Sequence, residues 1–194
     1  MLPQGGQAAG ILFVRMGIGM ARRITEKEIE KLYIKYKTPP HVISHCRAVT
    51  RVALGIAGAL NEHGYHLDLD LIRSAGLSHD IARTQEDHSG VCADILEQMG
   101  YHDEAAIVRV HMNYPLNPLE SLNETDLVCL GDRLVKEDKY VGLDERFRYI
   151  MDKAPHSQEI QTHLTEHRER MRHLLQQIEE LTGIQIDALF EDGN

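Results

Sequence analysis

From about residue 24 onward, apolar side chains recur at intervals of three or four positions, with polar residues between them. This is the period of one face of an α-helix, and no segment shows the strict alternation of a half-buried β-strand. We therefore predict an all-α fold, a single helical bundle with a long C-terminal helix. The expected helices cover about residues 25–37, 40–63, 68–81, 88–98, 103–111, 123–135, 143–151 and 157–181.

Three of these helices begin with capping signals. Thr25 and Glu28 have the spacing of a capping box, in which each side chain bonds to the other residue's backbone N–H. Asp68 or Asp70 is placed to cap the third helix, and Asn123 the sixth. The caps and the apolar period agree on where these helices start, so we expect these boundaries to hold.

The 194 residues are enough for one domain that buries its core without disulfides. The patterned sequence begins near Ile24, so we interpret residues 1–23 as an N-terminal extension, either an upstream start or a functional arm. Residues 24–155 form the expected domain. Residues 156–194 form a C-terminal helical extension, amphipathic enough to pack on the domain or on a second subunit. A homodimer is therefore one of the possible assemblies that the sequence allows.

Charge and cysteine content narrow the function classes. The net charge of −9 argues against a protein that neutralises a nucleic-acid backbone, so we expect a small substrate. Cys46, Cys92 and Cys129 lie far apart without a C-x-x-C pair, which favours a reducing compartment. The apolar run over 8–14 is too short to span a bilayer and follows no charged residue. We expect a cytoplasmic protein without a membrane partner.

Twelve histidines suggest metal chemistry, because imidazole is the commonest transition-metal ligand. His79 and Asp80 are adjacent at the end of an apolar helix; both reach one ion only if it lies between them, and a carboxylate there can bridge to a second ion. His45 lies on an apolar stripe, where a histidine buried in the core is the alternative. Asp132 follows an apolar stretch, and a buried carboxylate needs a cation or another partner such as Arg133.

In this order, the four residues resemble the H…HD…D signature of the HD superfamily of metal-dependent phosphohydrolases. The segments 77–83 (LSHDIAR) and 130–135 (LGDRLV) resemble its central and closing motifs, and the resemblance spans about residues 25–155. It comes closest to the dinuclear branch that contains the symmetrical dinucleoside tetraphosphatases, which places two further ligands at His88 and His111. For both histidines, a simple helix-end role is the alternative. The implied metal ligands are His45, His79, Asp80, His88, His111 and Asp132.

The resemblance also implies the chemistry of the site. A set of imidazoles and carboxylates favours Fe or Mn, with Mg, Co, Ni and Zn as alternatives. Two ions about 3.5–4 Å apart activate a water and hold the attacking and leaving oxygens at phosphorus. Asp80, as the bridge, and Arg83 are the expected catalytic residues; Arg83 and Lys136 are expected to bind substrate. A Lys commonly replaces Arg83 in that branch, and both basic residues have an alternative role as solvated or ion-paired helix ends.

The leading functional prediction is hydrolysis of a phosphoester or phosphoanhydride in a nucleotide-type small molecule. Two alternatives stay open: a diiron oxygenase with the same fold, and a non-catalytic module that binds a nucleotide or a metal. His163 and His167 have the spacing of a helical metal pair, but their charged neighbours predict a polar face rather than a site.

Overall fold

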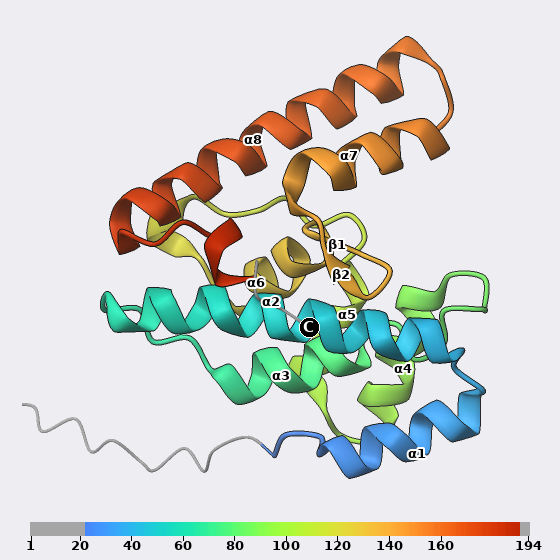
Figure 1. Cartoon of the computed structure of the whole chain (residues 1–194). Coiled ribbons are helices and arrows are strands. Elements are labelled where there is room, and N and C mark those ends of the chain that lie inside the picture. The colour runs from blue at the N-terminus through green and yellow to red at the C-terminus, as the bar shows by residue number, and fades with distance from the viewer. Residues whose placement is uncertain (1–21, 191–194) are drawn as a thin grey trace, which may run out of the picture.

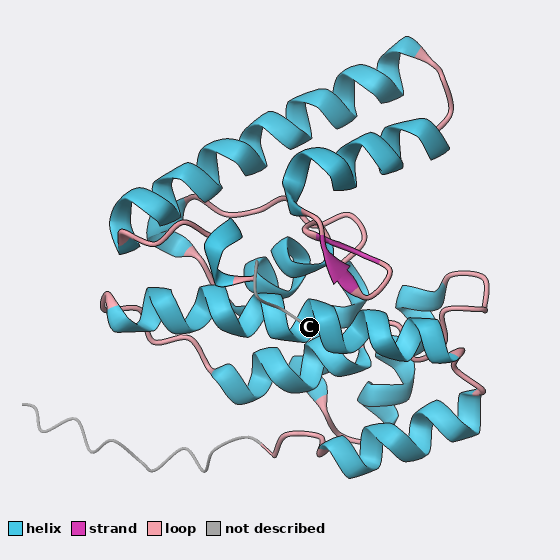
Figure 2. Cartoon of the chain, in the orientation of Figure 1, coloured by secondary structure: helices cyan, strands magenta, loops and turns pink. Residues whose placement is uncertain are grey.

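The computed structural model describes residues 22–190 of the chain, so the predicted N-terminal extension lies almost wholly outside the described residues. Within this range the chain is helical, as predicted, and the eight expected helices are present (Figures 1 and 2). The helices are α1 (Glu26–Tyr36), α2 (Pro40–Glu62), α3 (Leu69–Ser78), α4 (His88–Gln98), α5 (His102–Val110), α6 (Glu124–Asp132), α7 (Gly142–Lys153) and α8 (Gln158–Thr182). Two 3₁₀ turns, η1 (Leu119–Ser121) and η2 (Asp187–Leu189), and two short strands, β1 (Val135–Lys136) and β2 (Lys139–Tyr140), complete the described chain.

The predicted caps are confirmed. Thr25 and Glu28 form a complete capping box at α1. Of the two candidates for α3, Asp68 is the N-cap and accepts hydrogen bonds from two backbone N–H groups. Asn123 caps α6, with Asp126 closing a second capping box. Each cap satisfies backbone donors that a helix leaves without partners in its first turn.

The sequence pattern misplaced the end of the sixth helix and missed the strands. Helix α6 ends at Asp132, and Val135 pairs with Tyr140 in a two-residue antiparallel hairpin. The tight turn places Glu137 at a φ of 56°, outside the helical region. Buried Leu134 and Val135 continue the apolar spacing of α6, but they fill the core from the hairpin instead. The carbonyl of Glu137 thereby comes within hydrogen-bond distance of the candidate site.

Helix α2 runs through the middle of the molecule, between α3 on one side and the α7–α8 hairpin on the other (Figure 1). Most of its buried residues, among them Val52, Ile56 and Leu60, belong to the larger of two apolar clusters, together with residues of α3, α6, α7 and α8. The smaller cluster joins α1, α4 and α5 to the turn after α3.

Two glycines let α3 and α6 approach α2 closely. A Cβ on Gly76 would lie 2.6 Å from Thr50 Oγ1, and a Cβ on Gly131 would lie 2.8 Å from the Val49 carbonyl oxygen. Such distances exclude any side chain without a shift of the helices. The close approach brings the C-terminal ends of α3 and α6 to the level of His45 on α2.

The long C-terminal helix α8 packs on the domain. Its residues Met171, Leu174 and Ile178 are buried in the larger cluster, where they meet Leu143 and Phe147 of α7. No helix within residues 22–190 is both long and apolar enough to cross a membrane.

Candidate metal centre

Three histidine rings, two of them buried and that of His45 partly buried, lie side by side at the meeting point of α2, α3 and α5. The ring centroids of His45 and His79 are 5.5 Å apart, and those of His79 and His111 are 5.1 Å apart. Two of the rings have the same backbone support: Nδ1 lies 2.7 Å from a carbonyl oxygen one turn earlier, that of Gly76 for His79 and that of Val108 for His111. The rings are therefore fixed in direction by their own helices.

The hydrogen bonds also fix the tautomer. A neutral imidazole carries one proton, so a ring that donates Nδ1–H to a carbonyl keeps a free lone pair on Nε2. His79 and His111 therefore offer a free Nε2 lone pair, which is the form that binds a metal ion. His45 differs, because its Nδ1 lies 2.8 Å from the Glu137 carbonyl oxygen and its Nε2 lies 3.1 Å from Asp132 Oδ1, so both ring nitrogens face acceptors. Burial lowers the pKa of His45, but the hydrogen bond to Asp132, together with the charge of Asp132 and the Glu137 carbonyl, outweighs burial and raises it.

Asp80 lies between two groups of candidate ligands. His79 Nε2 lies 3.7 Å from Oδ2 of Asp80, whereas His88 Nε2 and His111 Nε2 lie 3.2 Å and 3.8 Å from Oδ1. Within each group, all candidate ligand atoms are less than 4.8 Å apart. The first group consists of His45, His79 and Asp80, and the second of Asp80, His88 and His111. A carboxylate with one oxygen toward each group has the geometry of a bridging ligand.

The residues present fit a metal site. His79 Nε2 and Asp80 Oδ1 are both buried and have no hydrogen-bond partner. A buried polar atom without a partner costs about 1–3 kcal/mol, so two such atoms in one site favour a further group that binds them. Imidazole nitrogens with carboxylate oxygens suit divalent transition metals.

Asp132 completes the arrangement from α6. Its Oδ1 lies 3.1 Å from His45 Nε2, outside the two three-residue groups but in contact with the first. Arg133 also pairs with it, and Arg146 Nη2 lies 3.7 Å away. Burial would raise the pKa of the Asp132 carboxyl, but Arg133 and the hydrogen bond to His45 hold it well below its usual range. Of the partners considered for Asp132 from the sequence, a cation and Arg133, the structure shows Arg133.

The local charges favour the ligand forms of the other two central residues. Burial opposes ionisation of Asp80, yet His79, His88 and Arg83 outweigh it and lower its pKa to about 2. Burial, reinforced by His79, lowers the pKa of His111 to about 4. At neutral pH the site therefore offers an anionic carboxylate and a neutral imidazole.

A cavity of about 820 Å³ opens above these residues. Apart from Asp80 and Asp132, Glu137 is its one acidic lining residue, a contrast with the net charge of −9 for the whole chain. The positively charged side chains that line it are Arg83, Arg133, Arg146, Lys153 and Arg170. A positive cavity in an acidic protein favours an anionic ligand.

The two basic residues expected to bind substrate lie in different places. Arg83 lines the cavity, with Nε 3.3 Å from Asp80 Oδ2 and Nη1 3.0 Å from His88 Nε2. Lys136 does not line the cavity; its Nζ lies 3.5 Å from Glu145 Oε1.

Comparison of the sequence with known proteins identifies the family of the chain. The HD domain family matches residues 42–137, the segment that carries all six predicted ligands. The uncharacterized protein MJ0778 of Methanocaldococcus jannaschii is 37% identical, over 54% of this chain and 72% of that protein. The chain belongs to the HD domain family. The chain is also similar to a tRNA (cytidine(56)-2'-O)-methyltransferase of Thermoplasma volcanium, at 33% identity over 59% of this chain and only 37% of that protein. No solved structure matches significantly.

Sequence reasoning missed the part of the cavity that lies outside the family match. Helix α7 contributes Arg146, Tyr149 and Lys153, and α8 contributes His163 and His167. The two α8 histidines were predicted to lie on a polar face away from any site, whereas they line this cavity. The repeat of basic residues seven positions apart on α7 was an available signal for a charged helix face.

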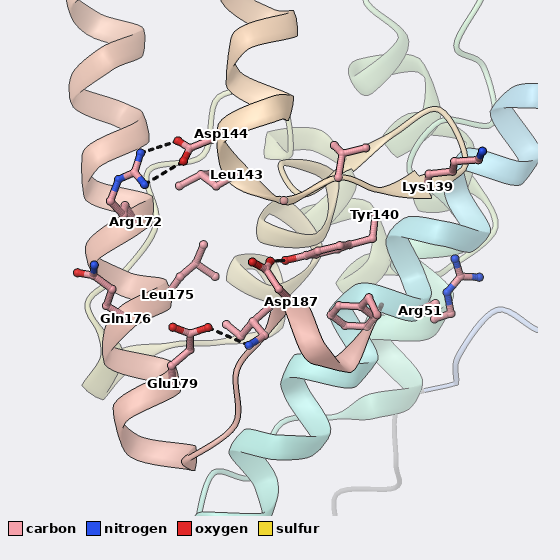
Figure 3. Close-up of a pocket in the computed structure, with 14 residues that line it drawn as sticks. Arg51, Lys139, Tyr140, Leu143, Asp144, Arg172, Leu175, Gln176, Glu179 and Asp187 are labelled. Atoms are coloured by element: carbon pink, nitrogen blue, oxygen red, sulfur yellow. Dashed lines mark hydrogen bonds and ion pairs between the residues drawn. The ribbon is translucent and has the colours of Figure 1, made fainter. Parts of the chain in front are cut away.

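A second cavity of about 680 Å³ lies between α2, β2 and α8 (Figure 3). Its charged side chains largely satisfy one another. Arg172 pairs with Asp144, and Tyr140 donates to Asp187. Neither of the two candidate metal groups found among the described residues lies in it; both lie at the HD site.

Proposed function

We propose that this HD domain is a metal-dependent phosphohydrolase that cleaves a phosphoester or phosphoanhydride of a nucleotide-type small molecule. The observation that carries this proposal is Asp80, whose two oxygens face two separate ligand groups at the floor of a basic cavity. A dinuclear site with a positively charged cavity above it suits a phosphorylated substrate.

The histidines and Asp80 would bind the metal ions of the proposed hydrolase. Metal ions bound between the two ligand groups would supply an activated water and neutralise charge at phosphorus. His45, His79, His88 and His111 would hold the ions through their ring nitrogens. Asp80, with one oxygen toward each group, would be a ligand in both.

Arginines at the cavity floor would bind and orient the phosphate. Arg83 lies beside Asp80, and Arg133 and Arg146 lie beside Asp132. A guanidinium offers two parallel N–H donors to a phosphoryl oxygen pair, so it positions the group and stabilises charge that builds during cleavage.

The set of four histidines and two aspartates is similar to that of the symmetrical dinucleoside-tetraphosphatase branch, and we propose this branch as the nearest in chemistry. Arg83 stands where that branch commonly has a lysine. Iron or manganese is the proposed metal, because the donor set is rich in imidazole and has no thiolate.

A second candidate is a phosphate carried by RNA. The similar Thermoplasma volcanium protein is named as a tRNA methyltransferase, and the match covers 37% of it. Successive phosphates would suit the basic lining of the cavity. The acidic net charge favours the small substrate.

The test combines metal analysis with phosphate release. The wild type, Asp80→Ala and the control Asp138→Ala are loaded with Mn²⁺ or Fe²⁺ and assayed on nucleotides, dinucleoside tetraphosphates and short RNAs with terminal phosphates. We expect about two ions per chain, and turnover that only Asp80→Ala abolishes. Metal binding with oxygen consumption and no phosphate release would move the assignment to the oxygenase. Nucleotide binding without turnover under any added ion would move it to the regulatory module.

A further inference from the structure

One face of α7 carries a row of side chains that leads away from the metal centre. Arg146, Tyr149 and Lys153 are three and four residues apart, so they lie on the same side of the helix. All three line the cavity. Arg146 Nη2 lies 3.7 Å from Asp132 Oδ1, which fixes the inner end of the row at the site. Lys153 is two turns further, roughly 10 Å along the helix axis.

Positive charges gather around the ring of Tyr149. The nitrogens of Lys136 and Lys153 lie 5.1 Å and 5.3 Å from the ring centroid, and the guanidinium carbon of Arg146 lies 5.8 Å from it. Contact with an aromatic face stabilises each cation by about 0.5–1 kcal/mol at an exposed site. Three cations around one ring also repel one another, and this repulsion is relieved by an anion.

Among the described residues, carboxylates pair with two of the three cations around Tyr149 but not with the third. Lys136 pairs with Glu145 at 3.5 Å, and Arg146 shares Asp132 with Arg133. Lys153 has no carboxylate within 4 Å among residues 22–190, although it lines the cavity. The outer end of the row therefore presents a positive charge that no described side chain balances.

We infer that the substrate carries a second phosphate, which binds at Lys153 while the scissile phosphate lies at the metal centre. The inference rests on the proposed hydrolase function and deepens it by naming the substrate class: a nucleoside bisphosphate, with its two phosphates on different positions of the sugar. Ile150 and Phe147 line the same cavity beside Tyr149 and offer apolar surface for the base, next to the sugar that links the two phosphates. Helix α7 lies outside residues 42–137, so this subsite is set by a part of the chain beyond the family match.

Binding of intact ligand tests the subsite without depending on turnover. Equilibrium dialysis of the metal-loaded protein in the cold compares adenosine 3′,5′-bisphosphate with adenosine 5′-monophosphate, and chromatography counts only the uncleaved nucleotide. The variants are Lys153→Gln and Lys153→Arg. Arg148→Gln is the control, because it removes the same charge from the opposite face of the same helix, where Arg148 lies beside Asp144 and Asp152.

We expect the wild type and Arg148→Gln to bind the bisphosphate at least about tenfold more tightly than the monophosphate, the factor of one charge-assisted hydrogen bond. Lys153→Gln should remove that preference and leave monophosphate binding unchanged, and Lys153→Arg should retain it. Equal affinity of the wild type for the two nucleotides would refute the subsite, as would a preference that survives Lys153→Gln. Tighter binding of a four-nucleotide RNA than of the bisphosphate would refute the small-substrate class.

The experiments distinguish a failure of the Lys153 subsite from a failure of the hydrolase function. A bisphosphate preference that depends on Lys153, without phosphate release from any nucleotide, would leave the subsite standing and overturn the hydrolase. Phosphate release with equal affinity for the two nucleotides would leave the hydrolase standing and overturn the subsite.

Discussion

His45 Nε2 lies 3.1 Å from Asp132 Oδ1, although 87 residues separate the two in the chain. Their helices, α2 and α6, reach this distance because Gly131 packs against the backbone of α2, with its absent Cβ 2.8 Å from the Val49 carbonyl oxygen and 3.3 Å from Ala53 Cβ. The position before Asp132 thus decides whether that carboxylate meets the histidine.

Gly131→Ala should therefore disturb both stability and the site. The added methyl group collides with backbone, which cannot rotate away, so we expect a loss of about 1–3 kcal/mol in the free energy of unfolding and weaker metal binding. Denaturant titration and metal analysis measure the two effects. Gly58→Ala on α2 is the control, since nothing lies within 4 Å of its Cβ position, and it should stabilise by about 0.5 kcal/mol. An equal response of the two variants would contradict the packing argument.

The position of Asp80 predicts different metal counts for two ligand variants. Asp80→Asn should lose both ions and lower turnover by more than about 100-fold, because both groups use this carboxylate. His88→Gln removes a member of the second group only, so one ion should remain with His45, His79 and Asp80. Metal analysis by mass spectrometry, with circular dichroism to verify folding, distinguishes the two. The same residual stoichiometry in both variants would show that Asp80 is not shared.

Acid should destabilise the metal-stripped protein through His111. Burial, reinforced by His79, lowers its folded-state pKa to about 4, whereas an unfolded histidine titrates near 6.5. Between these values the unfolded chain binds a proton that the folded protein does not, so stability falls as the pH drops from about 6.5 to about 4. Denaturant midpoints at about pH 7 and about pH 4.5 should differ less in His111→Gln than in the wild type. His102→Gln, an exposed histidine on the same helix, should keep the wild-type difference.

Arg83 should affect turnover more than metal content. It contacts Asp80 and His88 from the cavity side, where its side chain stays 45% exposed and therefore accessible to a substrate. Arg83→Gln should retain about two ions and lose about 100-fold in kcat, the scale for removal of one donor to a developing charge. Arg83→Lys should be intermediate, because it keeps the charge but not the two parallel donors. Arg73→Gln, exposed on α3, should match the wild type. Loss of metal in Arg83→Gln would instead make Arg83 a support for its neighbours.

The sequence determined the helices and the residues that gather at the centre. Apolar period and capping chemistry act within one or two turns, so Thr25, Asp68 and Asn123 could be read directly as helix starts. The HD motif identified the candidate ligands, because it is an ordered set and not a single dipeptide. The end of α6 was misjudged, because Leu134 and Val135 continue the helical spacing of apolar residues. In the structure they are buried in the core beyond the helix end, where Val135 belongs to a hairpin.

Only the tertiary structure decided what faces the ligands. The basic cavity combines Arg83 and Arg133 with Arg146, Lys153 and Arg170 from two helices beyond the family match. A charged residue on an amphipathic helix reads as solvent-exposed from sequence, because local spacing does not say which neighbour its polar face meets. The direction of each imidazole was hidden for the same reason, since the carbonyl of Glu137 that orients His45 comes from a turn 92 residues away. Long-range packing, and not local pattern, sets the chemistry of this centre.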